Sequence, residues 1–224
     1  MHAIRVARYG VLATVLMNAG IQAQSVSFGV KGGVPLTSAV ESNGRVPGAK
    51  RYTVGPMIEI ALPFSFAFEL DALYRRTGYD VIGGDLGTTT DTHLRANSWE
   101  FPFLAKYYFG PRRVPVRFYT AGGYVLRHMS GFDISIHSYG TDFFSGRPFD
   151  STFHTGSTQD YVRDNPANGF VAGGGARFQI GHFAVAPEVR YTRWVGITFD
   201  QFGSHGFFVQ SLQNQADVLV GITF

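Results

Sequence analysis

The segment SWEFPFLAKYYF, residues 98–109, places bulky apolar side chains at almost every second position. The bulky members are Trp99, Phe101, Phe103, Tyr107 and Phe109, and the positions between them include Glu100 and Lys106. Successive side chains of a β-strand point to opposite sides of the sheet, so this spacing predicts a strand with one apolar and one charged face. Aromatic residues also favour strands over helices. The segment therefore indicates a fold built from strands.

Seven other segments repeat this alternation. Their apolar positions are Val26, Phe28, Val30 and Val34; Tyr52, Val54, Ile58 and Ile60; Phe66, Phe68, Leu70 and Tyr74; Phe118, Tyr124 and Leu126; Phe170, Ala172, Ala176 and Phe178; Phe183, Val185, Val189 and Tyr191; and Val218, Val220, Ile222 and Phe224. The composition agrees, with 28 Gly, 15% aromatic and only 16% charged residues. We expect one all-β domain of about eight strands.

The connections between these segments alternate in length. Residues 63–65, 110–115 and 181–182 form short turns, whereas residues 35–50, 78–94, 131–168 and 195–214 form long connections. Short turns at one end and long loops at the other are typical of an up-and-down antiparallel transmembrane β-barrel, with short periplasmic turns and long extracellular loops. No later segment offers the roughly 18 consecutive apolar residues that a membrane-spanning helix needs.

The N-terminus has the order of a secretory signal peptide. Arg5 and Arg8 precede an apolar stretch at residues 11–17, and residues 18–23 follow, in which Ile21 departs mildly from the small-x-small pattern before a cut after Ala23. This stretch is too short to cross a bilayer of about 30 Å as a helix. We therefore predict a signal peptide at residues 1–23, with cleavage near Ala23, and an outer-membrane β-barrel domain at residues 24–224.

Charge and side-chain size indicate which face of the strands points outward. The polar positions carry seven basic and six acidic residues, with glycines between them: Lys31, Glu59, Glu69, Asp71, Arg75, Glu100, Lys106, Arg117, Arg127, Arg177, Glu188, Arg190 and Asp217. Long and short side chains together suit the narrow interior of an eight-stranded barrel, while the aromatic face suits lipid. We expect an ion-pair network that fills the lumen. A secreted lipocalin-like binding barrel would alternate in the same way and is an alternative.

A small or gated pore for polar solutes is a further alternative. In that case Glu69, Asp71, Arg75, Glu188 and Arg190 would line a polar pathway. An eight-stranded barrel usually has interior space only for its own side chains, which argues against open conduction. An unpaired charge in such a lumen would cost several kcal/mol, so a structural role for these residues is favoured.

Four stretches resemble the Gram-negative outer-membrane β-barrel domain family, of the PorT-like and OmpA-like or OmpX-like kind. They are SWEFPFLAKYYF at 98–109, YTAGGYVLR at 119–127, APEVRYTRW at 186–194 and ADVLVGITF at 216–224. The resemblance implies a fold and an outer-membrane location rather than a reaction. The ending at Val218, Val220, Ile222 and Phe224 is similar to the signal that the barrel-assembly machinery recognises in its clients.

His128 and Ser130 resemble the His-x-Ser arrangement of lipid A deacylase barrels, in which the histidine activates a serine nucleophile. By parity both side chains would face lipid. Gly131 stands where that family has Asn, and no carboxylate can be assigned to orient the histidine, although Asp133 and Asp142 follow. We therefore favour a boundary histidine beside a turn-forming Ser-Gly pair. A lipid A-modifying hydrolase is kept as an alternative to a non-enzymatic barrel.

The presumed long loop at residues 131–168 is both acidic and aromatic. A cap over the barrel mouth is favoured, and an adhesion or ligand-binding surface is the alternative. Arginines near the presumed outer rim suggest contacts with lipopolysaccharide phosphates: Arg75, Arg76, Arg95, Arg127 and Arg193. Outer-membrane lipid and lipopolysaccharide are therefore the expected surroundings of a monomeric barrel.

The remaining composition excludes several kinds of site. The chain has no Cys, so it has neither a disulfide nor a thiolate metal site. The histidines show no ligand-type spacing, and we expect no metal and no cofactor. The basic residues are scattered despite a net charge of +3, so we expect no nucleic acid as a partner.

Overall fold

The computed structural model describes residues 25–38, 40–42, 52–85, 87–111, 113–142, 144–155, 164–198, 200–202 and 208–224. The predicted signal peptide lies outside the described residues, so it and the domain boundary at residue 24 stay predictions. Within the described part of the chain, no helix is long and apolar enough to cross a membrane.

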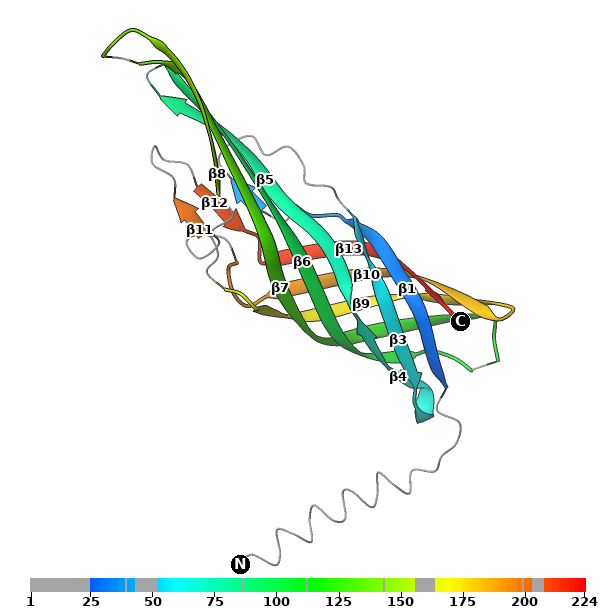
Figure 1. Cartoon of the computed structure of the whole chain (residues 1–224). Coiled ribbons are helices and arrows are strands. Elements are labelled where there is room, and N and C mark those ends of the chain that lie inside the picture. Colours follow the sequence, from blue (N-terminus) through cyan, green and yellow to red (C-terminus); the bar gives the residue numbers. More distant parts are fainter. Residues whose placement is uncertain are drawn as a thin grey trace, which may run out of the picture.

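Antiparallel strands form a closed ring (Figure 1). They are β1 (Val26–Pro35), β3 (Thr53–Ala61), β4 (Phe66–Asp71), β5 (Leu73–Asp85), β6 (Thr88–Tyr108), β7 (Val116–Thr141), β9 (Ala167–Ile180), β10 (Phe183–Trp194) and β13 (Asn214–Thr223). β4 and β5 both pair with β3 and act as one barrel strand interrupted at Ala72. β1 pairs with β13, which closes an eight-membered ring and confirms the predicted barrel.

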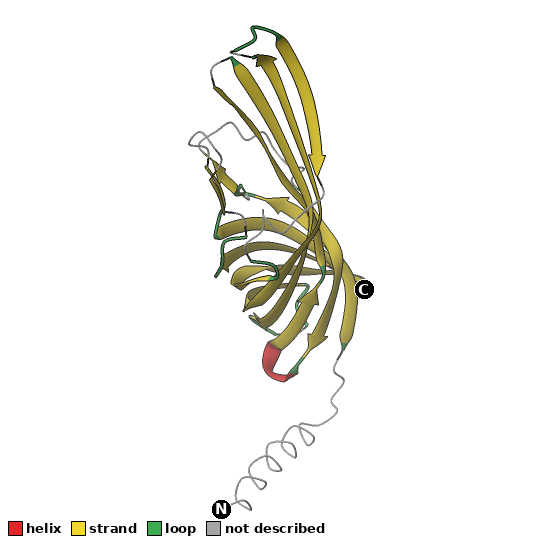
Figure 2. Ribbon diagram, turned by 60° about the vertical axis from the view of Figure 1, so that its left-hand side comes forward, coloured by secondary structure: helices red, strands yellow, loops and turns green. Residues whose placement is uncertain are grey.

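The short connections lie together at one end of the barrel. They are the 3-10 turn η1 (Pro63–Ser65), the segment between β6 and β7, and the turn between β9 and β10. Figure 2 shows η1 in red at this end. We call it the short-turn end and the opposite end the long-loop end. In transmembrane barrels of this kind the short turns face the periplasm.

At the long-loop end three ring strands continue past the ring and form, together with a fourth strand, a protruding sheet (Figure 2). It consists of residues 78–85 of β5, 88–95 of β6, 132–141 of β7 and β8 (Pro148–Thr155). β5 and β6 stay paired up to Asp85 and Thr88, and β8 pairs with the last part of β7. The connections predicted as loops at 78–94 and 131–168 are therefore largely strands.

A second small sheet lies at the long-loop end. It consists of β2 (Val40–Ser42), β11 (Asp200–Phe202) and β12 (Phe208–Ser211), with β12 in the middle. These strands come from the first and last long connections, which are far apart in sequence and adjacent in space (Figure 1). The long-loop end therefore carries two separate sheets.

Burial along the barrel strands follows the predicted parity. Phe28, Phe118 and Phe170 point outward and are 54%, 65% and 61% exposed, respectively. Their inward neighbours are charged or small, and Lys31 is only 1% exposed. Apolar side chains on the outside and polar ones inside are the reverse of a soluble domain and match a barrel in hydrocarbon. The charged lumen is therefore the feature that needs explanation.

Candidate functional site

Lys31 of β1 lies in the middle of a group of buried carboxylates. Its Nζ donates to Glu69, and also to Asp71 and Glu188 at 3.3 Å each. Arg190 of β10 contacts the same three acids, with Nε donating to Glu188 at 2.6 Å and Nη1 to Asp71 at 3.0 Å. Two cations, from β1 and β10, thus contact three acids from β4 and β10.

The network continues from Glu69 toward the short-turn end. Lys106 of β6 contacts Glu69 and donates to Glu59 at 3.0 Å. Arg177 of β9 reaches Glu59 from the other side at 2.6 Å, and the Tyr108 hydroxyl donates to the same carboxylate. We call this continuous group the central cluster: Lys31, Lys106, Arg177, Arg190, Glu59, Glu69, Asp71 and Glu188. It contains as many carboxylates as cations.

A second group, the outer cluster, lies nearer the long-loop end. Arg75 of β5 donates to Asp217 of β13 at 2.8 Å, and Arg127 of β7 donates to Glu100 of β6 at 2.9 Å. Arg75 also lies 3.9 Å from Glu100, which links the two pairs. Two cations therefore balance two carboxylates in this cluster as well.

Polar partners that the sequence interpretation missed complete both clusters. Gln215 accepts from Arg127 at 2.6 Å and donates to Asp217 at 2.7 Å. The guanidinium of Arg127 also lies 3.6 Å from the ring centroid of Trp194, and the Tyr119 hydroxyl donates to Glu188 at 3.0 Å. Parity alone would have placed these side chains inside the barrel. Their contacts depend on the ring's stagger, which parity does not give.

Twelve of the thirteen predicted interior residues therefore belong to one of the two clusters. The remaining one, Arg117 of β7, lies with its guanidinium 4.6 Å from the ring centroid of Tyr108. Arg75 is buried and Arg127 is half-buried, and both pair with carboxylates of the outer cluster, so they are not rim residues open to lipopolysaccharide. Arg76 and Arg193 are exposed, as a rim contact would require.

Glycines and apolar side chains fill the space that the charges leave. A Cβ at Gly175 would lie 2.8 Å from the Tyr119 hydroxyl, and a Cβ at Gly221 would lie 3.5 Å from the Lys31 side chain. The distance at Gly175 is too short for a side chain, so this position must stay small, whereas the distance at Gly221 is an ordinary van der Waals contact. Beyond them, an apolar group packs across the lumen: Leu104, Val125, Ala167, Val171 and Trp194. The cross-section is thus occupied by side chains at several levels.

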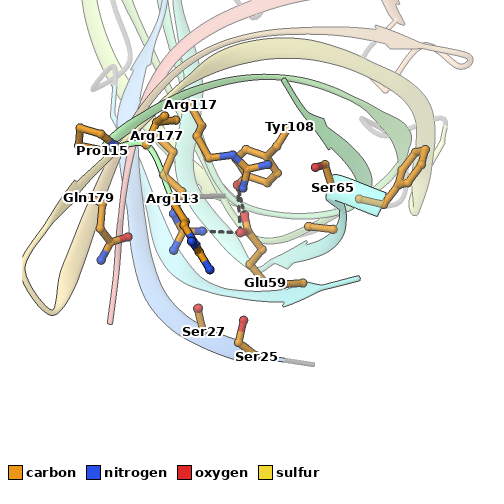
Figure 3. Close-up of a pocket in the computed structure, with 14 residues that line it drawn as sticks. Ser25, Ser27, Glu59, Ser65, Tyr108, Arg113, Pro115, Arg117, Arg177 and Gln179 are labelled. Atoms are coloured by element: carbon orange, nitrogen blue, oxygen red, sulfur yellow. Dashed lines mark hydrogen bonds and ion pairs between the residues drawn. The ribbon is translucent and has the colours of Figure 1, made fainter. Parts of the chain in front are cut away.

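A cavity of about 400 Å³ opens at the short-turn end, beyond the central cluster (Figure 3). Glu59, Tyr108 and Arg177 form its floor, and Arg113 and Arg117 line it from the β6–β7 turn and β7. This polar cavity is bounded by the ion pairs of Glu59 on its inner side.

His128 and Ser130 occupy the positions expected for them on β7. Both are exposed on the outward side of the barrel, opposite Trp99 and Asn97 of β6. Among the described residues, neither side chain makes a hydrogen bond or ion pair, and no carboxylate orients the histidine. The structure therefore brings together no Ser-His-acid arrangement here.

Charged pairs of a different kind lie on the protruding sheet. Asp80 of β5 contacts Arg95 at 2.5 Å and His93 at 2.8 Å, and His137 contacts Asp150 at 2.9 Å. Partial burial acts to raise the pKa of Asp80, but hydrogen bonds from Arg95 and His93 outweigh it and bring the pKa below its ordinary value. Within the described residues no group of three histidine or acidic side chains could hold a metal ion.

Comparisons with known proteins agree with the barrel. A family profile described as "Outer membrane protein beta-barrel domain" matches residues 22–193. Comparison with curated protein sequences finds no match.

Three solved structures illustrate the similarity. The N-terminal β-barrel domain of Pseudomonas aeruginosa OprF is 15% identical, with a TM-score of 0.35, over 91% of this chain and 100% of that chain. Neisserial surface protein A is 11% identical, with a TM-score of 0.39, over 90% and 98%. Ail, the attachment invasion locus protein of Yersinia pestis, was solved with the heparin analogue sucrose octasulfate. It is 12% identical, with a TM-score of 0.38, over 90% and 97%.

Proposed function

Because the chain belongs to the outer membrane protein β-barrel domain family, we propose that it is a non-enzymatic, non-conducting barrel that displays its protruding sheet as an interaction surface outside the cell. Family membership places it in the cell outer membrane, which removes the soluble lipocalin-like alternative. The observation that carries the proposal is the charge-balanced lumen. If the lumen is closed by its own ion pairs, the exposed ends of the barrel are the surfaces that remain for interaction with partners.

The central cluster supports a closed lumen. Lys31, Lys106 and Asp71 are 1%, 1% and 0% exposed, so water has little access to them. Lys31 and Lys106 each contact at least two carboxylates, and opening a path would separate charges in a low-dielectric interior. The apolar layer that contains Leu104 and Val125 narrows the lumen further. Ion conduction would need the central cluster to open.

The protruding sheet supports the interaction role. Phe144, at the turn between β7 and β8, is 95% exposed, and Phe153 of β8 is 62% exposed. Exposed aromatic side chains beside polar ones are enriched where proteins bind partners. Within the described residues β8 pairs with β7 alone, and the sheet extends beyond the ring (Figure 2). The surface is therefore built on paired strands.

Membrane partners form a further part of the proposal. We propose that the outward residues Val218, Val220, Ile222 and Phe224 are read by the barrel-assembly machinery, as similar C-terminal strands are. Arg76 and Arg193 are exposed and suited to lipopolysaccharide phosphates. The ring closes on itself through β1 and β13, which supports a monomer.

Planar-bilayer recording tests the closed lumen. We expect a flat current trace for the wild type, because the central cluster blocks the lumen. The variant in which Lys31, Asp71, Glu188 and Arg190 are all replaced by Ala should conduct, because the side chains that block the lumen are removed. Two positive and two negative charges are removed together, so the central cluster stays balanced. Steady wild-type conductance that this variant does not change would contradict the proposal and favour the pore.

Cysteine labelling tests whether the protruding sheet lies outside the cell. The chain has no Cys, so a single substitution gives one reactive site. Ser145→Cys, at the tip of the protruding sheet, should react with a membrane-impermeant maleimide on intact cells. Val114→Cys, at the short-turn end, is the matched control and should react only after the outer membrane is opened. The opposite pattern would invert the proposed orientation.

A further inference from the structure

An apolar groove of about 730 Å³ lies on the outward side of the barrel wall. Its lining comes from β3, β4, β6, β7 and β9, which are neighbours in the ring (Figure 1). Four large outward side chains stand along it: Phe68, Phe103, Tyr124 and Phe170. The volume falls within the range of roughly 300 to 1,000 Å³ that is usual for pockets that hold a small molecule. We call this feature the outer groove.

Two small residues create the outer groove. Ala105 of β6 pairs with Gly122 of β7, whereas the next outward pair toward the long-loop end is Phe103 with Tyr124. On the other side of Ala105, Phe68 of β4 is its partner. A Cβ at Gly122 would meet only the Val171 carbonyl oxygen, at 3.8 Å, so packing within the barrel does not require a glycine there. The missing side chain leaves space on the outside of the wall.

Aromatic side chains flank the outer groove toward both ends of the barrel. Toward the long-loop end the rings of Tyr74 and Trp99 lie 5.3 Å apart, and toward the short-turn end the rings of Phe66 and Tyr107 lie 5.1 Å apart. Along β6, Ala105 lies between Trp99 and Tyr107. Aromatic girdles border the apolar band of a transmembrane barrel. The outer groove therefore opens into hydrocarbon, where lipid acyl chains surround the protein.

A basic residue lies beside the end of the outer groove that is nearer the long loops. Phe170 of β9 pairs with Arg193 of β10, which is exposed at the last outward position before β10 ends at Trp194. Arg193 donates to Asn214 at 2.6 Å. A guanidinium has five N–H donors in a planar fork, so others remain to bind a phosphate group. One end of this apolar site therefore carries a positive charge.

We propose that the outer groove holds one acyl chain of lipopolysaccharide while a phosphate of the same lipid A unit binds Arg193. A lipid A unit carries phosphate groups and acyl chains together, so one molecule can meet both the charge and the apolar surface. The inference rests on the proposed function, which puts the long-loop end outside the cell and gives Arg193 a lipopolysaccharide contact. It turns that single contact into a defined lipid site on β4, β6, β7 and β9.

Native mass spectrometry of the whole protein in uncharged detergent, titrated with purified lipid A, tests the site. Gly122→Leu fills the outer groove and Arg193→Gln removes the charge. Each should weaken lipid A binding at least tenfold, because apolar burial or a charge-assisted contact is lost. A heat-dependent gel shift shows that each variant is folded.

The chain offers a matched control for each variant. Gly32→Leu controls for the added side chain, because Gly32 is at an outward position of β1 and a Cβ there would meet its nearest atom at 3.5 Å. Arg147→Gln controls for the lost charge, because Arg147 is exposed on the turn between β7 and β8. Both controls should bind lipid A as the wild type does.

Two further observations separate other occupants of the outer groove. Phosphatidylethanolamine with acyl chains of the same length should bind at least tenfold more weakly than lipid A, because its ammonium group offsets the phosphate charge. Equal binding of the two lipids would overturn the choice of lipopolysaccharide. A wild-type dimer that Gly122→Leu abolishes would overturn the proposal in favour of a second copy of this chain.

Equal lipid A affinity of the wild type, Gly122→Leu and Arg193→Gln would overturn the site itself. That result would leave the closed lumen and the display untouched, because bilayer recording and cysteine labelling test them separately. The titration in detergent does not depend on which end of the barrel faces outward, so the two failures are distinguishable.

Discussion

Ion pairs occur both in the lumen and on the protruding sheet, in very different surroundings. The side chains of Lys31, Glu69 and Asp71 are at most 1% exposed, whereas Asp150 on the sheet is 74% exposed and its partner His137 is 36% exposed. Separating charges in the lumen leaves them without water, while on the sheet water replaces the lost partner. The same kind of contact is therefore structural inside the barrel and nearly neutral outside it.

The largest effect is expected from Lys31→Met. This change leaves the buried carboxylates Glu69, Asp71 and Glu188 with one cation fewer. Removing one partner of a buried ion pair costs about 3–5 kcal/mol. The free energy of unfolding should fall by that amount, measured by urea titration in lipid vesicles with tryptophan fluorescence as the signal. A loss below about 1 kcal/mol would mean that water reaches the central cluster.

The double variant Lys31→Met with Asp71→Leu is the matched control. It removes one charge of each sign, so the central cluster stays balanced, and Arg190 and Lys106 still contact the remaining acids. Replacing a buried pair with apolar groups of similar volume is often neutral. The double variant should therefore be more stable than Lys31→Met alone. Equal or lower stability would show that charge balance does not govern the lumen.

Arg127→Met should have an intermediate effect of about 2 kcal/mol on unfolding, since a hydrogen bond to a charged group contributes roughly 1.5–3 kcal/mol. Its side chain is 12% exposed, and Glu100 keeps Arg75 nearby at 3.9 Å. The fluorescence of Trp194 should also change, because Arg127 stacks on its ring. Arg127→Lys keeps the charge and separates the stacking from the ion pair. If the free energy of unfolding falls as much as in Lys31→Met, the outer cluster contributes as much to stability as the central cluster, which would contradict the expected difference.

The sequence was informative where hydrocarbon lies on one side of a strand. There, parity alone separated Phe28 from Lys31 and Phe103 from Lys106, and the inward set could be written out. Which charges meet could not be predicted, because Lys31 and Glu188 are 157 residues apart and their contact depends on the stagger of the ring. Trp194 and Gln215 were missed for the same reason.

The protruding sheet escaped prediction for a different reason. Thr88, Thr90 and Thr92 have β-branched side chains that favour strands, but they are polar and leave no apolar alternation to recognise. Water contacts this sheet, so the sequence pattern of its strands resembles that of a loop. The register also shifts between Arg95 and Asn97, where the sheet leaves the barrel. For these residues the sequence signal for strands was their β-branched content and not an alternation of apolar and polar positions.

The smallest effect is expected from Asp80→Asn on the protruding sheet. The contacts of Asp80 with Arg95 and His93 are partly exposed, so the loss should stay below about 1 kcal/mol. Hydrogen exchange of the β5 and β6 amides measures it as a change in local opening. The lowered pKa of Asp80 fixes the sign: the carboxylate stabilises the sheet above its unfolded-state pKa of about 3.9, and this contribution is lost as pH falls through the folded-state pKa. Wild type and variant should therefore differ at pH 7 and converge in strong acid. A difference that persists in acid would mean that Asp80 acts through packing rather than charge.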